Sequence, residues 1–145
     1  MTDHLALAAL LRARLTAELT LLRAVKSAAA IEEIADLVPA APAAILLWDG
    51  DALVQDAGGG RVQSIDQRWL VCLVVRSARE AAANTGVLEI AGPLIAQTLR
   101  CLQGWTPDLP GARPLKRIEA PKPGFAAGYG YFPLAFAARL IIQGD

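Results

Sequence analysis

Apolar residues recur every three to four positions in two parts of the chain, which is the spacing of a helix that buries one face. Leu7, Leu11, Leu15 and Leu19 predict a helix from Leu5 to about Leu19. A second helix is predicted over Val87–Leu102, where Pro93 produces a kink or marks the true first turn. Its core-facing positions are expected to be Val87, Ile90, Ala91, Leu94, Ile95, Thr98, Leu99 and Leu102.

A short third helix is predicted between these two. It runs from Ser27, as its N-cap, to about Leu37, where Pro39 and Pro42 end it. A loop is predicted over Ser77–Gly86.

Four further runs have the composition of strands. They are Ala43–Trp48, Arg61–Arg76, Leu115–Glu119 and the long extended run Phe125–Ile142, and Thr20–Ser27 could add a short one. Pro133 indicates an edge position or a bulge in the last run, because proline cannot donate to a strand ladder.

The strand over Arg61–Arg76 changes character along its length. Its odd positions are mostly apolar, while its even positions change from Ser64, Asp66 and Arg68 to Leu70, Cys72 and Val74. Such a strand leaves solvent and enters the centre of a sheet. We therefore expect a hairpin over Ala52–Arg68 to project from the body. Asp49-Gly50-Asp51 is read as a turn before it, Ala52–Gln55 as its rising strand and Gly58-Gly59-Gly60 as its tip.

The order of these elements predicts one α+β domain over residues 1–145. Its sheet of four to five strands is largely antiparallel or mixed, is flanked by two to three helices and carries the projecting hairpin.

The number and distribution of charged residues indicate which kinds of partner the chain could bind. The chain has 14 basic and 14 acidic side chains and a net charge of zero, which argues against a dedicated nucleic-acid-binding protein. Residues 1–60 carry a net charge of −4 and the remainder +4. Either the two halves pack against each other, or they present complementary surfaces for head-to-tail association.

Hydropathy predicts no membrane span, because the densest apolar runs are short and bounded by charges. The N-terminus does not predict a signal peptide, because it lacks the leading positive charge and the small-residue cleavage site of one. Cys72 and Cys101 are accordingly expected to be reduced thiols within the core.

Residues with catalytic potential are few. His4 is the only histidine, the two cysteines lack metal-ligand spacing, and Leu53 and Gly60 stand where a calcium loop starting at Asp49 needs oxygen ligands. Arg113, Lys116, Arg117 and Lys122 form the only basic cluster. Lys116 and Arg117 fall on opposite faces of a strand, which favours a solvated strand over a phosphate site. The sequence predicts no catalytic residue, metal or cofactor, and the chain is not expected to be an enzyme.

Six segments together carry a family resemblance: Ala43–Gly50, Gln67–Val71, Ala91–Ile95, Leu102–Trp105, Pro123–Phe125 and Tyr131–Leu134. They resemble the small tail-terminator-like proteins of Mu-like tailed phages and prophages. The resemblance implies a ring, usually hexameric, on the head-proximal end of the tail tube, which stops tube polymerisation and docks head-completion proteins. The implied partners are further copies of the chain, the tube protein and a head-completion or connector protein. The implied location is the bacterial cytoplasm during assembly and then the virion tail.

The hairpin Ala52–Arg68 is the candidate contact with the tube or with a neighbouring subunit. Its candidate contact residues are Asp51, Asp56, Arg61, Gln63, Asp66 and Arg68. Trp48 and Trp69 are expected in the core, while Trp105 fits either core or interface.

Three alternatives stay open. The hairpin could be solvated without a partner, or the chain could be another tail component such as a tube–sheath adaptor. It could also be a small-ligand-binding domain in which Tyr129 and Tyr131 line a pocket.

Overall fold

The structure, a computed structural model, describes residues 3–29, 33, 36, 39–77, 85–126 and 128–145. The elements are α1 (Leu7–Glu18), β1 (Ala24–Ser27), β2 (Ala43–Ala57), β3 (Val62–Arg76), α2 (Thr85–Leu102), β4 (Lys116–Ile118), β5 (Gly124–Ala126) and β6 (Tyr129–Gln143). The strands form one sheet in the order β1-β2-β3-β6-β4, with β5 also paired to β6. Among the described strands, β1 and β2 alone pair in parallel. The predicted α+β class and mixed, mainly antiparallel sheet are confirmed, with six described strands instead of four to five.

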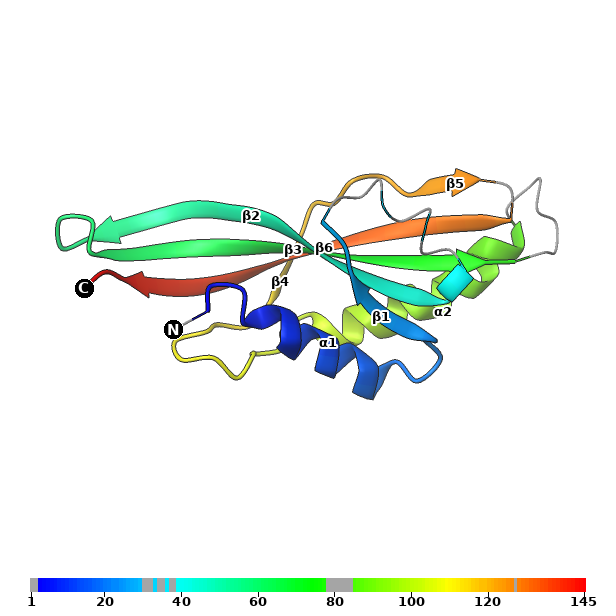
Figure 1. The fold of residues 1–145 in the computed structure, drawn as a ribbon, viewed down its shortest axis with the longest axis horizontal. Helices are drawn as coiled ribbons and strands as arrows, with labels where there is room; N and C mark the ends of the chain where they lie inside the picture. The colour runs from blue at the N-terminus through cyan, green and yellow to red at the C-terminus, as the bar shows by residue number, and fades with distance from the viewer. Residues whose placement is uncertain (1–2, 30–32, 34–35, 37–38, 78–84, 127) are drawn as a thin grey trace.

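Both helices lie on the same face of the sheet (Figure 1). The predicted stripe of α1 is buried throughout, because Leu7, Leu11, Leu15 and Leu19 pack on the strands below. Along α2 the predicted stripe is also mostly buried, but Ile90 is exposed. Pro93 lies within the helix and does not mark its first turn, because α2 already begins at Thr85.

The predicted helix from Ser27 to Leu37 does not begin at Ser27. That residue ends β1, and its hydroxyl accepts a hydrogen bond of 2.7 Å from Arg12 Nη2. Much of this predicted helix, and most of the loop predicted over Ser77–Gly86, lies outside the described residues.

The sheet has an apolar core on each face. The helix-side core joins the helices to alternate residues of the central strands, such as Val71, Leu73 and Phe136. The other face buries Ile45, Cys72 and Val74 beneath residues such as Ala41 and Ala120. The long strands are therefore buried on both sides within the body, as the run of apolar residues in β3 predicted.

β2, β3 and β6 continue together beyond the body as a three-stranded arm (Figure 1). We define the arm as Asp51–Ala57, Val62–Gln67 and Ala138–Gln143, which pair across β3. The expectation of a two-stranded hairpin was thus incomplete. β6 runs alongside β3 to its outer end, where Gln143 pairs with Val62. At the tip Gly58, Gly59 and Gly60 all have positive φ, a conformation that glycine adopts without steric cost.

Asp49-Gly50-Asp51 does not form the predicted turn. Trp48 pairs with Trp69 and Asp51 with Gln67, so Asp49 and Gly50 together stand opposite Arg68 as a bulge within a continuous strand. Gly50 has a φ of 81°, a conformation that favours glycine. The bulge therefore accounts for a glycine at this position, although the chain does not reverse its direction here.

Pro133 occupies the kind of position that was expected. It pairs with Cys72 on one side, while on its other side β5 ends its pairing at Tyr131 and β4 begins at Ala135. Its missing N–H therefore interrupts neither ladder. The run predicted as a single strand from Phe125 divides into β5 and β6.

Trp48 was predicted in the core but is 44% exposed, because β2 leaves the body at this point. Trp69 is buried as predicted, and Trp105 packs against the helix-side core with the Arg14 guanidinium 5.4 Å from its ring centroid.

Both cysteines are free and buried, and burial raises the pKa of the Cys72 thiol to about 12. Among the described residues, no helix has the length and hydropathy needed to cross a membrane.

The α1 stripe sets the first prediction. We expect Leu15→Ala to lower the free energy of unfolding by about 2–5 kcal/mol, because the Leu15 side chain is fully buried and its truncation leaves a cavity in the core. Urea denaturation followed by circular dichroism measures this. Thr16→Ala, on the exposed side of the same turn, is the control and should stay within about 0.5 kcal/mol of wild type. Equal effects of the two substitutions would contradict this packing.

Candidate interaction surface

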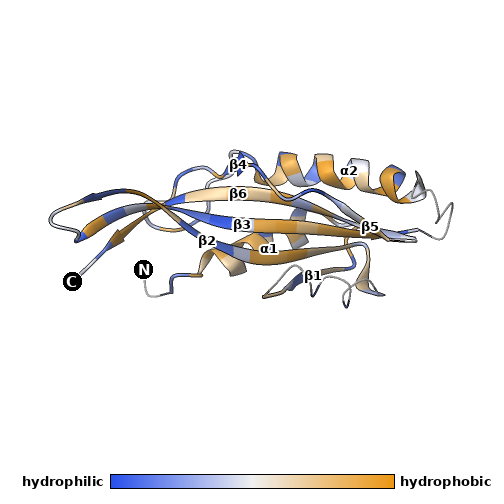
Figure 2. Ribbon diagram, turned by 90° about the horizontal axis from the view of Figure 1, so that it is seen from above, coloured by the Kyte–Doolittle hydropathy of each residue, from blue (hydrophilic) through white to orange (hydrophobic). Residues whose placement is uncertain are grey.

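The arm exposes apolar side chains on both of its faces. Residues opposite one another in a sheet share a face, so Leu53 lies on the helix-side face with Ile65, whereas Val62 and Ile141 lie on the far face. Leu53 is 72% exposed and Ile141 47% exposed. Hydrophobic and hydrophilic residues are mixed along the arm, while the strands in the body are mainly hydrophobic (Figure 2). The arm thus has less burial to stabilise it than the body has.

Both long edges of the arm are open within the described part of the chain, apart from the Arg139 carbonyl, which accepts a hydrogen bond from the Arg113 N–H. β1 pairs with β2 only as far as Leu46, and β4 pairs with β6 only over Ala135–Ala137. Beyond these points β2 and β6 have β3 as their strand partner on one side only. Open strand edges present unpaired backbone donors and acceptors, which are sites for pairing with another chain.

The six predicted contact residues do not form one patch. Asp51, Asp56 and Gln63 lie on the helix-side face, Asp66 and Arg68 lie on the far face, and Arg61 lies in the turn. Asp56, Arg61 and Arg68 are exposed, whereas the other three are partly buried. The structure therefore places these residues on two separate surfaces of the arm.

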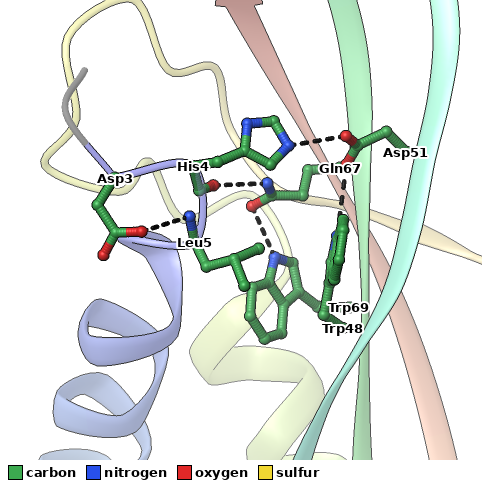
Figure 3. A network of polar contacts seen from close by, with 7 residues as sticks. All are labelled: Asp3, His4, Leu5, Trp48, Asp51, Gln67 and Trp69. Atoms are coloured by element: carbon green, nitrogen blue, oxygen red, sulfur yellow. Dashed lines mark hydrogen bonds and ion pairs between the residues drawn. The ribbon is translucent and has the colours of Figure 1, made fainter. Parts of the chain in front are cut away.

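A hydrogen-bond network fastens the N-terminal segment to the base of the arm (Figure 3). His4 Nε2 and Asp51 Oδ2 form a hydrogen bond of 2.7 Å, and the Trp48 indole N–H donates to the other oxygen of Asp51 at 3.4 Å. The amide of Gln67, which is fully buried, donates to the His4 carbonyl at 2.8 Å and accepts from Trp69 Nε1 at 2.9 Å. These bonds hold the start of α1 beneath the strands where the arm leaves the body.

On the far face Asp66 and Arg139 form an ion pair across β3 and β6. Arg139 Nε donates to Asp66 Oδ1, and Nη2 donates to Oδ2 at 3.1 Å. The hydrogen bond and the charge of Arg139 hold the pKa of Asp66 below its ordinary value, with burial acting in the opposite direction. Asp51 and Asp66 therefore have structural partners, which leaves the exposed Asp56, Arg61 and Arg68 and the partly buried Gln63 as candidates for contacts with other chains.

Three residues of the hydrogen-bond network and the ion pair were not predicted from the sequence as members of the site. Gln67 and Arg139 were not singled out, and His4 was considered only as a weak catalytic candidate. A signal for Arg139 existed, since it is the only charged residue between Tyr129 and Gln143. Nothing in the local sequence of His4 or Gln67 indicates that they meet, because 63 positions separate them.

Neither Tyr129 nor Tyr131 lines either of two clefts formed by described residues. One, of about 580 Å³, lies beside the outer end of β6 and is lined by His4, Leu109, Pro110, Gly111 and residues 140–143. The other, of about 590 Å³, lies between α2 and the segment after β4. The ring of Tyr131 instead lies so close over Gly124 that a Cβ there would overlap it. The described residues contain no cluster of three or more His, Cys, Asp or Glu that could hold a metal ion.

The buried amide gives a second prediction. Gln67→Leu removes the partners of the Trp69 indole N–H and the His4 carbonyl, and we expect the free energy of unfolding to fall by about 1–3 kcal/mol. Hydrogen exchange at the Leu5 amide should also accelerate, because the N-terminal segment loses its attachment. Gln63→Leu, on the same face nearer the tip, is the matched control. A loss no larger than that of the control would show that the network contributes little.

The ion pair gives a third prediction. A carboxyl group whose pKa is lowered on folding stabilises the protein above its unfolded pKa and loses that contribution as the pH falls through the folded pKa. We therefore expect Asp66→Asn to lower the free energy of unfolding at pH 7, with the difference from wild type shrinking below about pH 4. Urea titrations between pH 2 and 7, with Asp56→Asn as control for net charge, measure this. A difference that grows on acidification would have the wrong sign for this pair.

Comparison with known proteins bears on the role of this surface. The chain matches the phage tail terminator protein family over residues 1–144. No curated protein matches it. Because the match covers essentially the whole sequence, the chain belongs to the phage tail terminator protein family, a structural and non-catalytic component of phage tails that caps and terminates the tail tube.

Proposed function

We propose that the chain, as one domain, assembles into a ring at the head-proximal end of the tail tube of a Mu-like phage or prophage. Six copies are expected in the ring. There it stops tube polymerisation and docks the head-completion or connector protein. It assembles in the bacterial cytoplasm and stays in the virion tail.

The arm is the observation that carries this proposal. It extends three strands beyond the helices, leaves two strand edges open and exposes Leu53 and Ile141. Open edges and exposed apolar side chains favour association with other chains and are unfavourable in a protein that functions alone. An arm of this kind suits a subunit whose contacts are completed by its neighbours and by the tube.

The four remaining candidate residues divide between two roles in this proposal. Asp56, Arg61 and Gln63, at the outer end of the arm, contact the tube protein. Arg68, on the far face nearer the body, contacts a neighbouring subunit. The opposite net charges of the two sequence halves support a head-to-tail ring, in which each copy uses two different surfaces.

Leu53→Lys tests the arm. We expect wild type to occupy one end of tail tubes of the cognate phage as a ring and to stop their elongation, and Leu53→Lys to lose both activities with unchanged stability. A lysine at this exposed position opposes pairing of the strand with another chain, and the substitution removes no buried contact. Negative-stain microscopy and tube-length distributions measure this.

The matched control is Leu21→Lys, because Leu21 is also highly exposed, at 63%, but lies on the body after α1. It should cap tubes like wild type. Wild-type protein that never binds tube ends and leaves tube length unaffected would overturn the proposal.

A further inference from the structure

We propose that the open β2 edge of each arm pairs with the open β6 edge of the arm in the next copy, so that the arms of the ring close into one continuous β-barrel. This inference rests on the proposed ring and identifies the contact that builds it.

Strand direction makes the two edges compatible. β2 and β6 both run antiparallel to β3, so they run parallel to each other. In a ring with arms side by side, all arms point the same way along the axis. The β2 edge of one copy then meets the β6 edge of the next as a parallel pair, and the helix-side faces of both arms lie on the same side of the joined sheet.

The β6 edge has the orientation and the space to accept a strand. The Arg139 carbonyl accepts a hydrogen bond from the Arg113 N–H, so it points away from β3, whereas Gly144 N–H donates inward to the Arg61 carbonyl. Backbone groups alternate in direction along a strand, so those of Ile141 and Gln143 point outward like Arg139. The cleft of about 580 Å³ lies along residues 140–143. An incoming strand would meet free backbone groups there.

Charge favours a second copy in head-to-tail arrangement. β2 carries Asp49, Asp51 and Asp56 and no basic residue. The β6 side carries Arg139 on the strand with Arg113 and Lys116 beside it, while Asp145 at the C-terminus is acidic. Pairing β2 with β2 would place carboxylates opposite carboxylates, which is destabilising. Pairing β2 with β6 avoids this repulsion, because the carboxylates of β2 then lie beside the edge that carries Arg113 and Lys116.

The position of the helices favours closure with the far face of the arm inward. The helices lie on the other face, so the body of each copy would stand outside the barrel (Figure 1). The inward residues then include the polar Gln55, Ser64, Asp66, Arg139 and Gln143 and the apolar Val62 and Ile141. Three strands from each of six copies would give about 18, a size at which barrels such as porins enclose an aqueous channel.

An edge-blocking variant tests the proposal first. Ile141→Pro removes an outward N–H while leaving the ladder between β6 and β3 intact, and Ile141→Thr is the matched control that keeps the N–H. Circular dichroism and thermal unfolding check that both variants fold. We expect ring occupancy at tube ends to fall about tenfold or more for Ile141→Pro and to stay near wild type for Ile141→Thr.

Cross-linking tests it independently of that variant. Gln55→Cys and Gln143→Cys place exposed thiols on opposite edges of one arm. A short bismaleimide tolerates the stagger that strand tilt introduces. The native cysteines are buried and Cys72 has a raised pKa, so they should react slowly. On tubes, we expect the double variant to give a ladder of oligomers ending at the ring's copy number, and each single variant to stay monomeric.

The results separate this inference from the proposed function. A ladder in the double variant alone supports the barrel. Rings that form with Ile141→Pro, dimers from either single variant, or cross-links to the tube protein instead of a second copy would overturn the barrel and leave the capping role standing. Wild-type protein that forms no ring on tubes would overturn both.

Discussion

The pairing of β3 with β6 is the constraint on which the rest of the structure depends. It runs without a register shift from Val62 opposite Gln143 to Arg76 opposite Tyr129. Within the body this ladder places alternate residues into two separate cores, one beneath the helices and one on the far face. Beyond the body the same ladder continues with less burial, so the register set by the core also positions the arm.

The junction between body and arm is where polar interactions replace apolar packing. Leu70–Val75 of β3 are buried on both sides, whereas Asp66 and Gln67 are held by Arg139, Trp69 and the His4 carbonyl. The bulge at Asp49 and Gly50 falls at the same level. Bulges increase local twist and redirect a strand. The base of the arm is thus fixed by hydrogen bonds on both faces, and its outer half is left free for partners.

The sequence predicted those features that depend on local spacing. The α1 stripe, the glycine tip and the change in burial along β3 follow from period and composition, and all are present. The third strand of the arm could not be predicted, because an alternating pattern does not identify the partner of a strand. The division of the candidate contact residues between the two faces of the sheet was predictable in part. Gln63 and Asp66 occupy odd and even positions of one strand, so their side chains could not share a face.

Two open edges of opposite charge resolve a conflict faced by any subunit that must stay soluble before it assembles. An edge that pairs with its own kind would aggregate without limit, and long uncharged edges do so readily. Here three aspartates on β2 repel a second β2, while Arg113 and Lys116 beside β6 disfavour a second β6. The remaining combination joins unlike edges of two arms that point the same way, and such a contact ends only when the ring closes. Closure leaves no edge to extend, so in the proposed ring one charge pattern both selects the neighbour and limits the assembly.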